Sequence, residues 1–381
     1  MLPAVYRLLL PLLLALACVP DRTPLAGKTC AGTLECGPEL TCLAGVCAAP
    51  PADRWLAGPE LPEGLVFHGA TRLAEGGVLL TGGRDPSGAP RRALIYDPAL
   101  ATTREVAPLL EPRSAHASVL LPGGRVLVAG GVLGETEVKS TEIYDPALDR
   151  WQRAGDLLYT HAEFTLFVLP DGRVLTFGSS RGREFELFDP VTGAWEDAAD
   201  PEGFYSATAP VQLKDGSVLA LNQLGVERFD PGSGTWTRLA TTGSASAYNQ
   251  VTAALPSGQV LVAGGASSAQ KGLASAELLD PGSGSFESVT PMSVAREDHT
   301  ATLLPDGRVL VLGGVNAGGT PAATLGSAEL FDPERKAWTE APALEFPRTA
   351  HRATLLLDGS VLVTGGRNGA ATVTRAERYF P

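Results

Sequence analysis

The feature that most constrains the fold of this chain is an internal repeat. A stretch with the layout of "LPDGRVLVLGG" (304–314), a strand-like apolar run with a glycine turn and a closing glycine pair, occurs seven times in the 381 residues. The turn glycines are Gly76, Gly124, Gly172, Gly216, Gly258, Gly307 and Gly359. Their spacing gives units of 42 to 52 residues, a length typical of small supersecondary units that bury their apolar faces against one another.

Each unit predicts four short strands. The Asp-Gly, Gly-Gly or Ser-Gly turn favours a tight hairpin between strands one and two, because such turns need positive φ. A third strand ends in an aromatic or leucine residue followed by Asp-Pro, as in "IYDP" (143–146), and Asp-Pro suits a type I turn. Seven residues after this position, strand four opens with a large aromatic residue in five units: Trp151, Trp195, Trp236, Phe286 and Trp338. The first unit has Thr103 there.

Four-stranded units that repeat radially form a propeller, in which each blade covers the apolar face of the next. No sustained 3.6-residue apolar period supports helical crossovers. The last unit has only three strands, whereas "DRWLAGPEL" (53–61) matches "DRWQRAGDL" (149–157), which holds the fourth strand of the second unit. We therefore expect an N-terminal strand to complete the last blade, which also removes two exposed sheet edges.

The glycine pair after strand two, the aromatic residue of strand three and the tryptophan of strand four resemble kelch repeats over residues 53–381. The resemblance is specific in units two, six and seven, and eroded in unit three (Gly178-Ser179) and unit four (Asn222-Gln223). It implies a kelch-type β-propeller. Together with the repeat count, the N-terminal match and the clustered cysteines discussed below, the expected fold is all-β: a seven-bladed kelch-type β-propeller closed by an N-terminal strand and preceded by a small disulfide-rich module. Kelch propellers serve as binding and scaffolding modules and also as enzyme platforms, so the fold alone does not decide the function.

The first residues are typical of a secretory signal. One basic residue, Arg7, precedes an apolar run from Leu8 to Ala17 that is too short to span a bilayer, so we expect residues 1–17 to be a signal peptide. The run ends in Ala-Leu-Ala-Cys, which resembles a bacterial lipobox and predicts lipidation of Cys18, followed by a tether over 18–29. The alternative is ordinary cleavage after Ala17.

Four cysteines are clustered in residues 30–47, namely Cys30, Cys36, Cys42 and Cys47. In an exported chain this cluster predicts two disulfides, with three possible connectivities that the sequence leaves open. A four-thiolate zinc site is the alternative, although the spacing lacks short Cys-x-x-Cys pairs. The module precedes a linker (48–52) and the propeller (53–381).

Four histidines lie eight residues before a turn glycine: His68, His116, His299 and His351. Arginine stands three residues before three of them, at Arg113, Arg296 and Arg348. One interpretation is a cationic ring near the central channel that binds an anionic ligand or a metal. The other, favoured by the recurrence, is a set of structural hydrogen bonds that ties blade to blade.

A glutamate lies two residues before the aromatic position in six third strands: Glu142, Glu186, Glu227, Glu277, Glu329 and Glu377. Sixfold recurrence again favours a structural role over acid–base catalysis, and no catalytic residue is assigned. Galactose oxidase, a secreted kelch-like enzyme, uses copper and a Tyr–Cys crosslink, and this chain has no cysteine after Cys47. We therefore expect no cofactor and no metal. A sugar-active enzyme similar to the sialic-acid mutarotases, with its site at the channel mouth, remains the alternative.

The 2-3 and 4-1 connections of the blades are long and variable and share one face of the ring, where recognition is most common. We expect this face to bind a protein or a glycan. Its expected cationic residues are Arg84, Arg91, Arg92, Arg181, Arg183 and Arg367, with the Arg-x-x-His positions opening onto the same face. A net charge of −12 argues against nucleic acid. We therefore predict an exported monomer with a binding or scaffolding role at the bacterial cell envelope. Its expected location is the outer membrane or the cell surface, and the alternative is a periplasmic or extracellular protein. It should contact a membrane only through its lipid anchor.

Overall fold

The computed structural model describes residues 26–31, 36, 40–49, 52–61, 65–84, 88, 90–178, 184–202, 210–222, 225–240, 248–267, 271–319 and 322–381. The predicted signal peptide, Cys18, most of the tether, part of the linker, Arg181 and Arg183 lie outside these residues.

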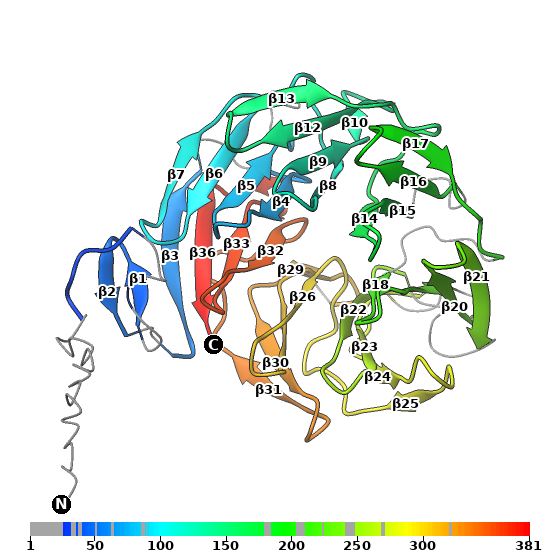
Figure 1. The fold of residues 1–381 in the computed structure, drawn as a ribbon. Coiled ribbons are helices and arrows are strands. Elements are labelled where there is room, and N and C mark those ends of the chain that lie inside the picture. Colours follow the sequence, from blue (N-terminus) through cyan, green and yellow to red (C-terminus); the bar gives the residue numbers. More distant parts are fainter. Residues whose placement is uncertain are drawn as a thin grey trace, which may run out of the picture.

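Seven four-stranded antiparallel sheets are arranged as a ring (Figure 1). Blade 1 consists of β4 (Gly69–Arg72), β5 (Val78–Thr81), β6 (Ala93–Asp97) and β7 (Thr102–Glu105); blade 2 of β8 (Ala117–Leu120), β9 (Val126–Ala129), β12 (Thr141–Asp145) and β13 (Arg150–Arg153); blade 3 of β14 (Thr165–Val168), β15 (Val174–Phe177), β16 (Glu186–Asp189) and β17 (Ala194–Asp197); blade 4 of β18 (Val211–Gln212), β19 (Val218–Asn222), β20 (Gly225–Asp230) and β21 (Thr235–Ala240); blade 5 of β22 (Val251–Ala254), β23 (Val260–Ala263), β24 (Ala276–Leu279) and β25 (Phe286–Ser288); blade 6 of β26 (Thr300–Leu303), β27 (Val309–Leu312), β30 (Ala328–Asp332) and β31 (Ala337–Ala341); blade 7 of β32 (Arg352–Leu355), β33 (Val361–Thr364), β36 (Arg375–Phe380) and β3 (Arg54–Glu60). The expected all-β, seven-bladed propeller is confirmed, and the described residues contain no α-helix.

The core is divided into seven apolar clusters, one between each pair of neighbouring blades. Leu127 and Ile143 of blade 2, for example, pack with Val174 and Trp195 of blade 3, and the other six pairs are joined in the same way. The second strands of the V-L-V type have side chains buried on both faces. Burial of both sheet faces explains why these strands are continuously apolar rather than alternating.

The N-terminal strand closes the ring, as the sequence match predicts. β3 pairs antiparallel with β36, and Trp55 lies opposite Tyr379 just as Trp151 lies opposite Tyr144 in blade 2. The ring centroids are 5.1 Å apart in the first pair and 4.9 Å in the second. In Figure 1, β3 and β36, from opposite ends of the chain, run side by side.

The shared Asp-Arg-Trp sequence has a physical explanation in both blades. The hydroxyl of Tyr379 donates to Asp53 (2.9 Å), and that of Tyr144 donates to Asp149 (2.7 Å). Each tryptophan Nε1 donates to a main-chain oxygen of the preceding blade, Trp55 to Pro342 (2.7 Å) and Trp151 to Ala107 (2.7 Å). The aspartate therefore fixes the tyrosine, and the tryptophan joins neighbouring blades.

The cysteine-rich module is a hairpin of β1 (Thr41–Leu43) and β2 (Val46–Ala48) held by two disulfides. The bonds are Cys30–Cys42 and Cys36–Cys47, which selects one of the three connectivities and uses all four sulfurs, so none is left for zinc.

The module packs where the first and last blades meet. The Thr41 hydroxyl donates to Asp358 in the 1-2 turn of blade 7 (2.9 Å), and the Gly45 N–H donates to Ala99 O in the 3-4 turn of blade 1 (3.0 Å). Asp358 also forms a buried ion pair with Arg378, whose Nη1 donates to Pro98 O (2.6 Å). We name the face that carries the 2-3 and 4-1 connections the loop face. The module therefore lies on the face opposite the loop face.

Short hairpins extend the loop face in three blades. They are β10–β11 (Val132–Leu133, Thr136–Glu137), β28–β29 (Val315–Asn316, Ala323–Thr324) and β34–β35 (Arg367–Asn368, Ala371–Thr372), in the 2-3 connections of blades 2, 6 and 7.

Candidate functional site: the loop face and the channel mouth

The arginines of the Arg-x-x-His positions are buried inside their own blades. Arg113 is fully buried, and its Nη1 donates to Gly130 O (2.7 Å) and Ser140 O (2.9 Å) while its Nη2 donates to Glu142 (2.7 Å). Arg296 repeats this arrangement in blade 6 with Glu329 (2.9 Å), and Arg348 pairs with Glu377 in blade 7. Each guanidinium thereby joins the 4-1 connection to strands two and three of the same blade.

The recurrent glutamates also hold the main chain of the 4-1 connections. Besides its arginine, Glu142 accepts the N–H groups of Leu110 (2.7 Å) and Glu111 (3.1 Å). Glu329 accepts those of Ser293 (2.7 Å) and Val294 (3.3 Å). Buried carboxylates that accept several such bonds and pair with a cation are structural anchors.

Blade 3 shows a variation of this device that the sequence analysis missed. His161 is fully buried, and its Nε2 lies 2.9 Å from Glu186 Oε1. Glu186 accepts the N–H groups of Leu158 and Tyr159 as well. The signal was present in the spacing, because His161 stands eleven residues before Gly172, as Arg113 does before Gly124.

The four histidines eight residues before the turn glycines are buried at blade boundaries. His116 Nε2 lies 2.8 Å from Thr81 Oγ1 in the preceding blade, His68 lies 2.8 Å from Thr364, and His351 lies 3.0 Å from Thr300. His299 is buried as well, but neither of its ring nitrogens has a hydrogen-bond partner among the described residues.

Burial lowers the pKa of these imidazoles. The pKa falls to about 3 for His68, His299 and His351, with a smaller effect from neighbouring arginines, and it lies well below the ordinary value for His116. These rings are therefore neutral at pH 7 and supply no positive charge to a ligand. Of the predicted cationic residues that the structure describes, this placement leaves those outside the Arg-x-x-His positions to meet a partner.

The histidines predict a pH dependence of stability. The pKa of His68, His299 and His351 is near 6.5 in the unfolded chain and about 3 in the folded one, so below pH 6.5 the unfolded state binds more protons and the folded state loses stability as the pH falls. Each should account for about 1 kcal/mol of lost unfolding free energy between pH 7 and pH 5.5. Urea unfolding at the two pH values should show a smaller loss for His351→Gln than for the unchanged chain; an equal loss would contradict this.

The channel mouth on the loop face carries the charged residues Glu163, Asp298 and Arg352. None of them has an ion pair within 4 Å among the described residues. Residues in the same repeat position, just before the histidine or its counterpart, have positive φ: Phe67, Ala115, Glu163, Asn249, Asp298 and Ala350. The Arg352 Nε donates to His68 O (2.9 Å), and the residue as a whole is exposed. Desolvation by the surrounding blades lowers the pKa of Arg352, and Glu163 acts in the opposite direction. Desolvation likewise raises the pKa of Asp298. The enzyme alternative at this mouth stays a prediction.

The predicted cationic residues of the loop face fall into two groups. Arg84 and Arg367 are exposed and occupy equivalent positions, directly after the glycine pairs of blades 1 and 7. Arg91 is exposed and its Nη1 donates to Leu110 O (3.3 Å), whereas Arg92 is half-buried beside Glu105 (4.0 Å). Arg84, Arg91 and Arg367 are therefore the exposed residues among the described predicted cations, and of these Arg91 is held by a hydrogen bond to a neighbouring connection.

The main chain under Arg84 and Arg367 is fixed. Arg84 and Val66 exchange N–H···O bonds of 2.8 and 3.2 Å, and Arg367 and Thr349 exchange bonds of 2.9 and 3.0 Å. Equivalent bridges between the 4-1 and 2-3 connections occur in other blades: Ser114–Val132, Tyr248–Ala266 and Glu297–Val315. At these bridged positions the side chains project from a main chain that is held by hydrogen bonds.

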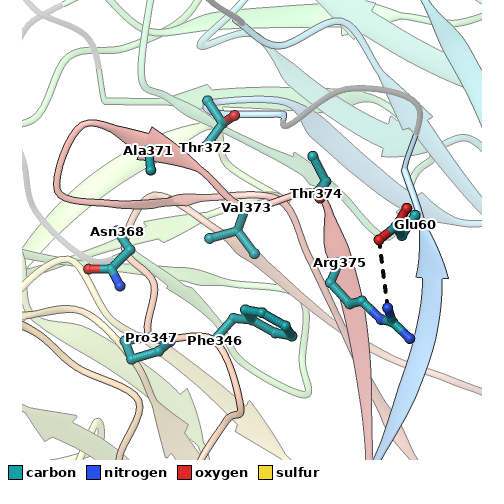
Figure 2. A pocket seen from close by; sticks show the side chains of 9 residues that line it. All are labelled: Glu60, Phe346, Pro347, Asn368, Ala371, Thr372, Val373, Thr374 and Arg375. Carbon is teal, nitrogen blue, oxygen red and sulfur yellow. Dashed lines mark ion pairs between the residues drawn. The ribbon is translucent and has the colours of Figure 1, made fainter.

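A cavity of about 290 Å³ lies at the edge of the loop face, where the connection from blade 6 meets the β34–β35 hairpin and the end of β3 (Figure 2). Its lining residues are Glu60, Phe346, Pro347, Asn368, Ala371, Thr372, Val373, Thr374 and Arg375. This pocket could not be predicted from the sequence, because residue 60 and residues 368–375 meet only through the closure of the ring.

Groups of side chains with the geometry to hold a metal ion are sparse in the part of the chain that the structure describes. The one group of three or more His, Cys, Asp or Glu residues with the geometry for an ion is Cys30, Cys36 and Cys47, which are engaged in disulfides. Within the same described residues, no helix has the length and apolar character to cross a membrane.

Comparison with known sequences points to one repeat type. Residues 113–158, which hold blade 2, match the family model of the Kelch motif. A 136-residue segment is 32% identical to Kelch-like protein 33 from Homo sapiens; it covers 35% of this chain and 24% of the human protein. The match thus spans about a quarter of that protein's length.

Among solved structures, a fungal alcohol oxidase of the AA5 family in complex with copper is similar. The TM-score is 0.70 at 18% sequence identity, and the superposition covers 87% of this chain and 76% of the oxidase. At this identity the likeness shows the fold alone.

Proposed function

Because the chain is a kelch-repeat β-propeller, we propose that it is a non-catalytic binding or scaffolding module that recognises a protein or glycan through its loop face. Kelch propellers generally mediate protein binding. The observation that carries the proposal is the pair Arg84 and Arg367, exposed at equivalent positions of adjacent blades on a main chain held by bridging hydrogen bonds.

The charge of this region favours an acidic partner. The chain as a whole carries −12, yet the loop side of blades 7 and 1 presents Arg84, Arg91 and Arg367, with Arg352 at the channel mouth nearby. A local positive patch on an acidic molecule steers oppositely charged partners to one face and disfavours other contacts.

Charge reversal tests this proposal. Arg84→Glu combined with Arg367→Glu should slow association with a captured partner by about tenfold at low salt, because exposed charges at an interface act mainly on the rate of encounter. The partner is isolated from envelope extract with the immobilised full chain and measured by surface plasmon resonance. Arg335→Glu, on an exposed 3-4 turn of the opposite face, is the matched control. Equal association rates for both variants would contradict the proposal.

We further propose export and anchoring at the bacterial cell envelope through lipidated Cys18. Two disulfides are consistent with an oxidising compartment. The module packs on the face opposite the loop face, so an N-terminal anchor would leave the binding face free. Mass spectrometry of the mature N-terminus checks this: an unmodified N-terminus at Val19 or later is incompatible with the anchor.

A further inference from the structure

The pocket at the edge of the loop face combines an apolar centre with a polar rim. Figure 2 shows Phe346 and Val373 in its middle, Asn368 towards one end and the Arg375–Glu60 ion pair at the other. Ala371 and Pro347 extend the apolar part. The pocket is therefore amphipathic on the scale of one small ring.

The rim offers hydrogen-bonding groups that the protein does not use itself. The side chains of Asn368, Thr372 and Thr374 have no hydrogen-bond partner among the described residues, and Nη1 of Arg375 lies beside Glu60. Asn and Thr side chains both donate and accept, and Arg donates only. The side chains of Asn368, Thr372 and Thr374 are therefore available for hydrogen bonds with a ligand.

The charges of the pocket cancel. Arg375 Nη1 lies 3.6 Å from Glu60 Oε1, and both side chains are exposed, 40% and 72%. The Glu60 carboxylate would repel an anion, and the Arg375 guanidinium would repel a cation. The pocket thus favours a neutral ligand.

The walls are fixed in place. The Phe346 carbonyl accepts a hydrogen bond from Nε of the buried Arg348 (3.1 Å), and Thr374 O accepts the Leu61 N–H (2.8 Å). Val373 N–H donates to Gly366 O (2.9 Å). The site is preformed, which lowers the entropy cost of binding.

From these observations we infer that the pocket binds one neutral sugar ring of a glycan. A pyranose has an apolar C–H face for Phe346 and hydroxyl groups that donate and accept around its edge, which matches the rim. A cavity of about 290 Å³ lies at the lower end of small-molecule pockets, of the order of 300 Å³, and suits a single ring. An aliphatic side chain of a peptide would leave the polar rim unsatisfied. The inference rests on the proposed binding function and adds to it a separate subsite for a neutral sugar ring.

The test is saturation-transfer NMR on the full chain with the methyl glycosides of glucose, galactose, mannose and N-acetylglucosamine. At least one should receive saturation at millimolar concentration. Asn368→Ala and Phe346→Leu should each weaken its binding about fivefold or more. Asn316→Ala, the equivalent position of β28 in blade 6, should leave the affinity unchanged. Circular dichroism and the melting temperature show whether each variant is folded.

The inference is overturned if none of the four glycosides receives saturation. It is also overturned if the two pocket variants and the control bind the sugar with equal affinity. Binding of anionic sugars in preference to neutral ones overturns it as well. The Arg84→Glu, Arg367→Glu variant separates this inference from the proposed function: it should lose partner capture and keep sugar binding. If only the inference is wrong, partner capture still depends on the two arginines, but no neutral sugar binds.

Discussion

Glu329→Gln is expected to lower the free energy of unfolding by about 3–5 kcal/mol. Its partner Arg296 is fully buried, and Glu329 is its one ion-pair partner within 4 Å among the described residues (Nη2–Oε1, 2.9 Å). Burial already lowers the pKa of Arg296, and Glu329 offsets part of that effect. Because an arginine side chain stays charged in proteins, the glutamine leaves an uncompensated cation inside blade 6. Urea unfolding at pH 7 measures the loss.

Two variants show whether burial of the unpaired charge causes the loss. Glu287→Gln breaks an ion pair with Lys336 (2.6 Å) whose side chains are about half exposed, so it should cost less than about 1 kcal/mol. Arg296→Met combined with Glu329→Leu removes both charges and should recover part of the stability, because the N–H groups of Ser293 and Val294 still lose their acceptor. If Glu329→Gln costs no more than Glu287→Gln, the buried pair is not the anchor of the 4-1 connection.

The architecture was predictable because the repeat exposes its own period. The glycine turns, the Asp-Pro turns and the tryptophan positions locate the strands, and the match of residues 53–61 to 149–157 identifies the closing strand. In six third strands the turn aspartate accepts the N–H two residues on, as Asp145 does from Ala147 (3.0 Å), which explains why this residue type recurs.

The candidate site was only partly predictable, because burial decides which repeated residues remain accessible. Arg113 and Arg367 are both arginines on connections of the same face, yet one is buried against Glu142 and the other is exposed. The pairing of Arg113 with Glu142 could have been found from the joint occurrence of both residue types in units two, six and seven. The pocket could not, since Glu60 reaches Arg375 only after β3 has paired with β36.

Trp55→Ala is expected to open the ring at its closure and to lower the free energy of unfolding by about 3 kcal/mol. The indole packs on Tyr379 at 5.1 Å between ring centroids and donates to Pro342 O of blade 6. It therefore fixes β3 both to β36 and to the neighbouring blade. β3 has no covalent connection to the rest of blade 7, so weakening its side-chain contacts permits a partial opening that other fourth strands do not have. Hydrogen exchange should show faster exchange of the amides of β3 and β36.

Trp151→Ala is the matched control for this effect, because Trp151 has the same ring partner and the same kind of hydrogen bond in blade 2. Its strand β13 is continuous with β12 through a tight turn and with blade 3 through the next connection, so it cannot leave the sheet independently. The control should therefore lose a similar or larger free energy of unfolding while the amides of β36 keep their protection. Unchanged protection of β36 in Trp55→Ala would mean that the main-chain pairing of β3, together with the disulfide module on blades 7 and 1, is enough to hold the ring closed.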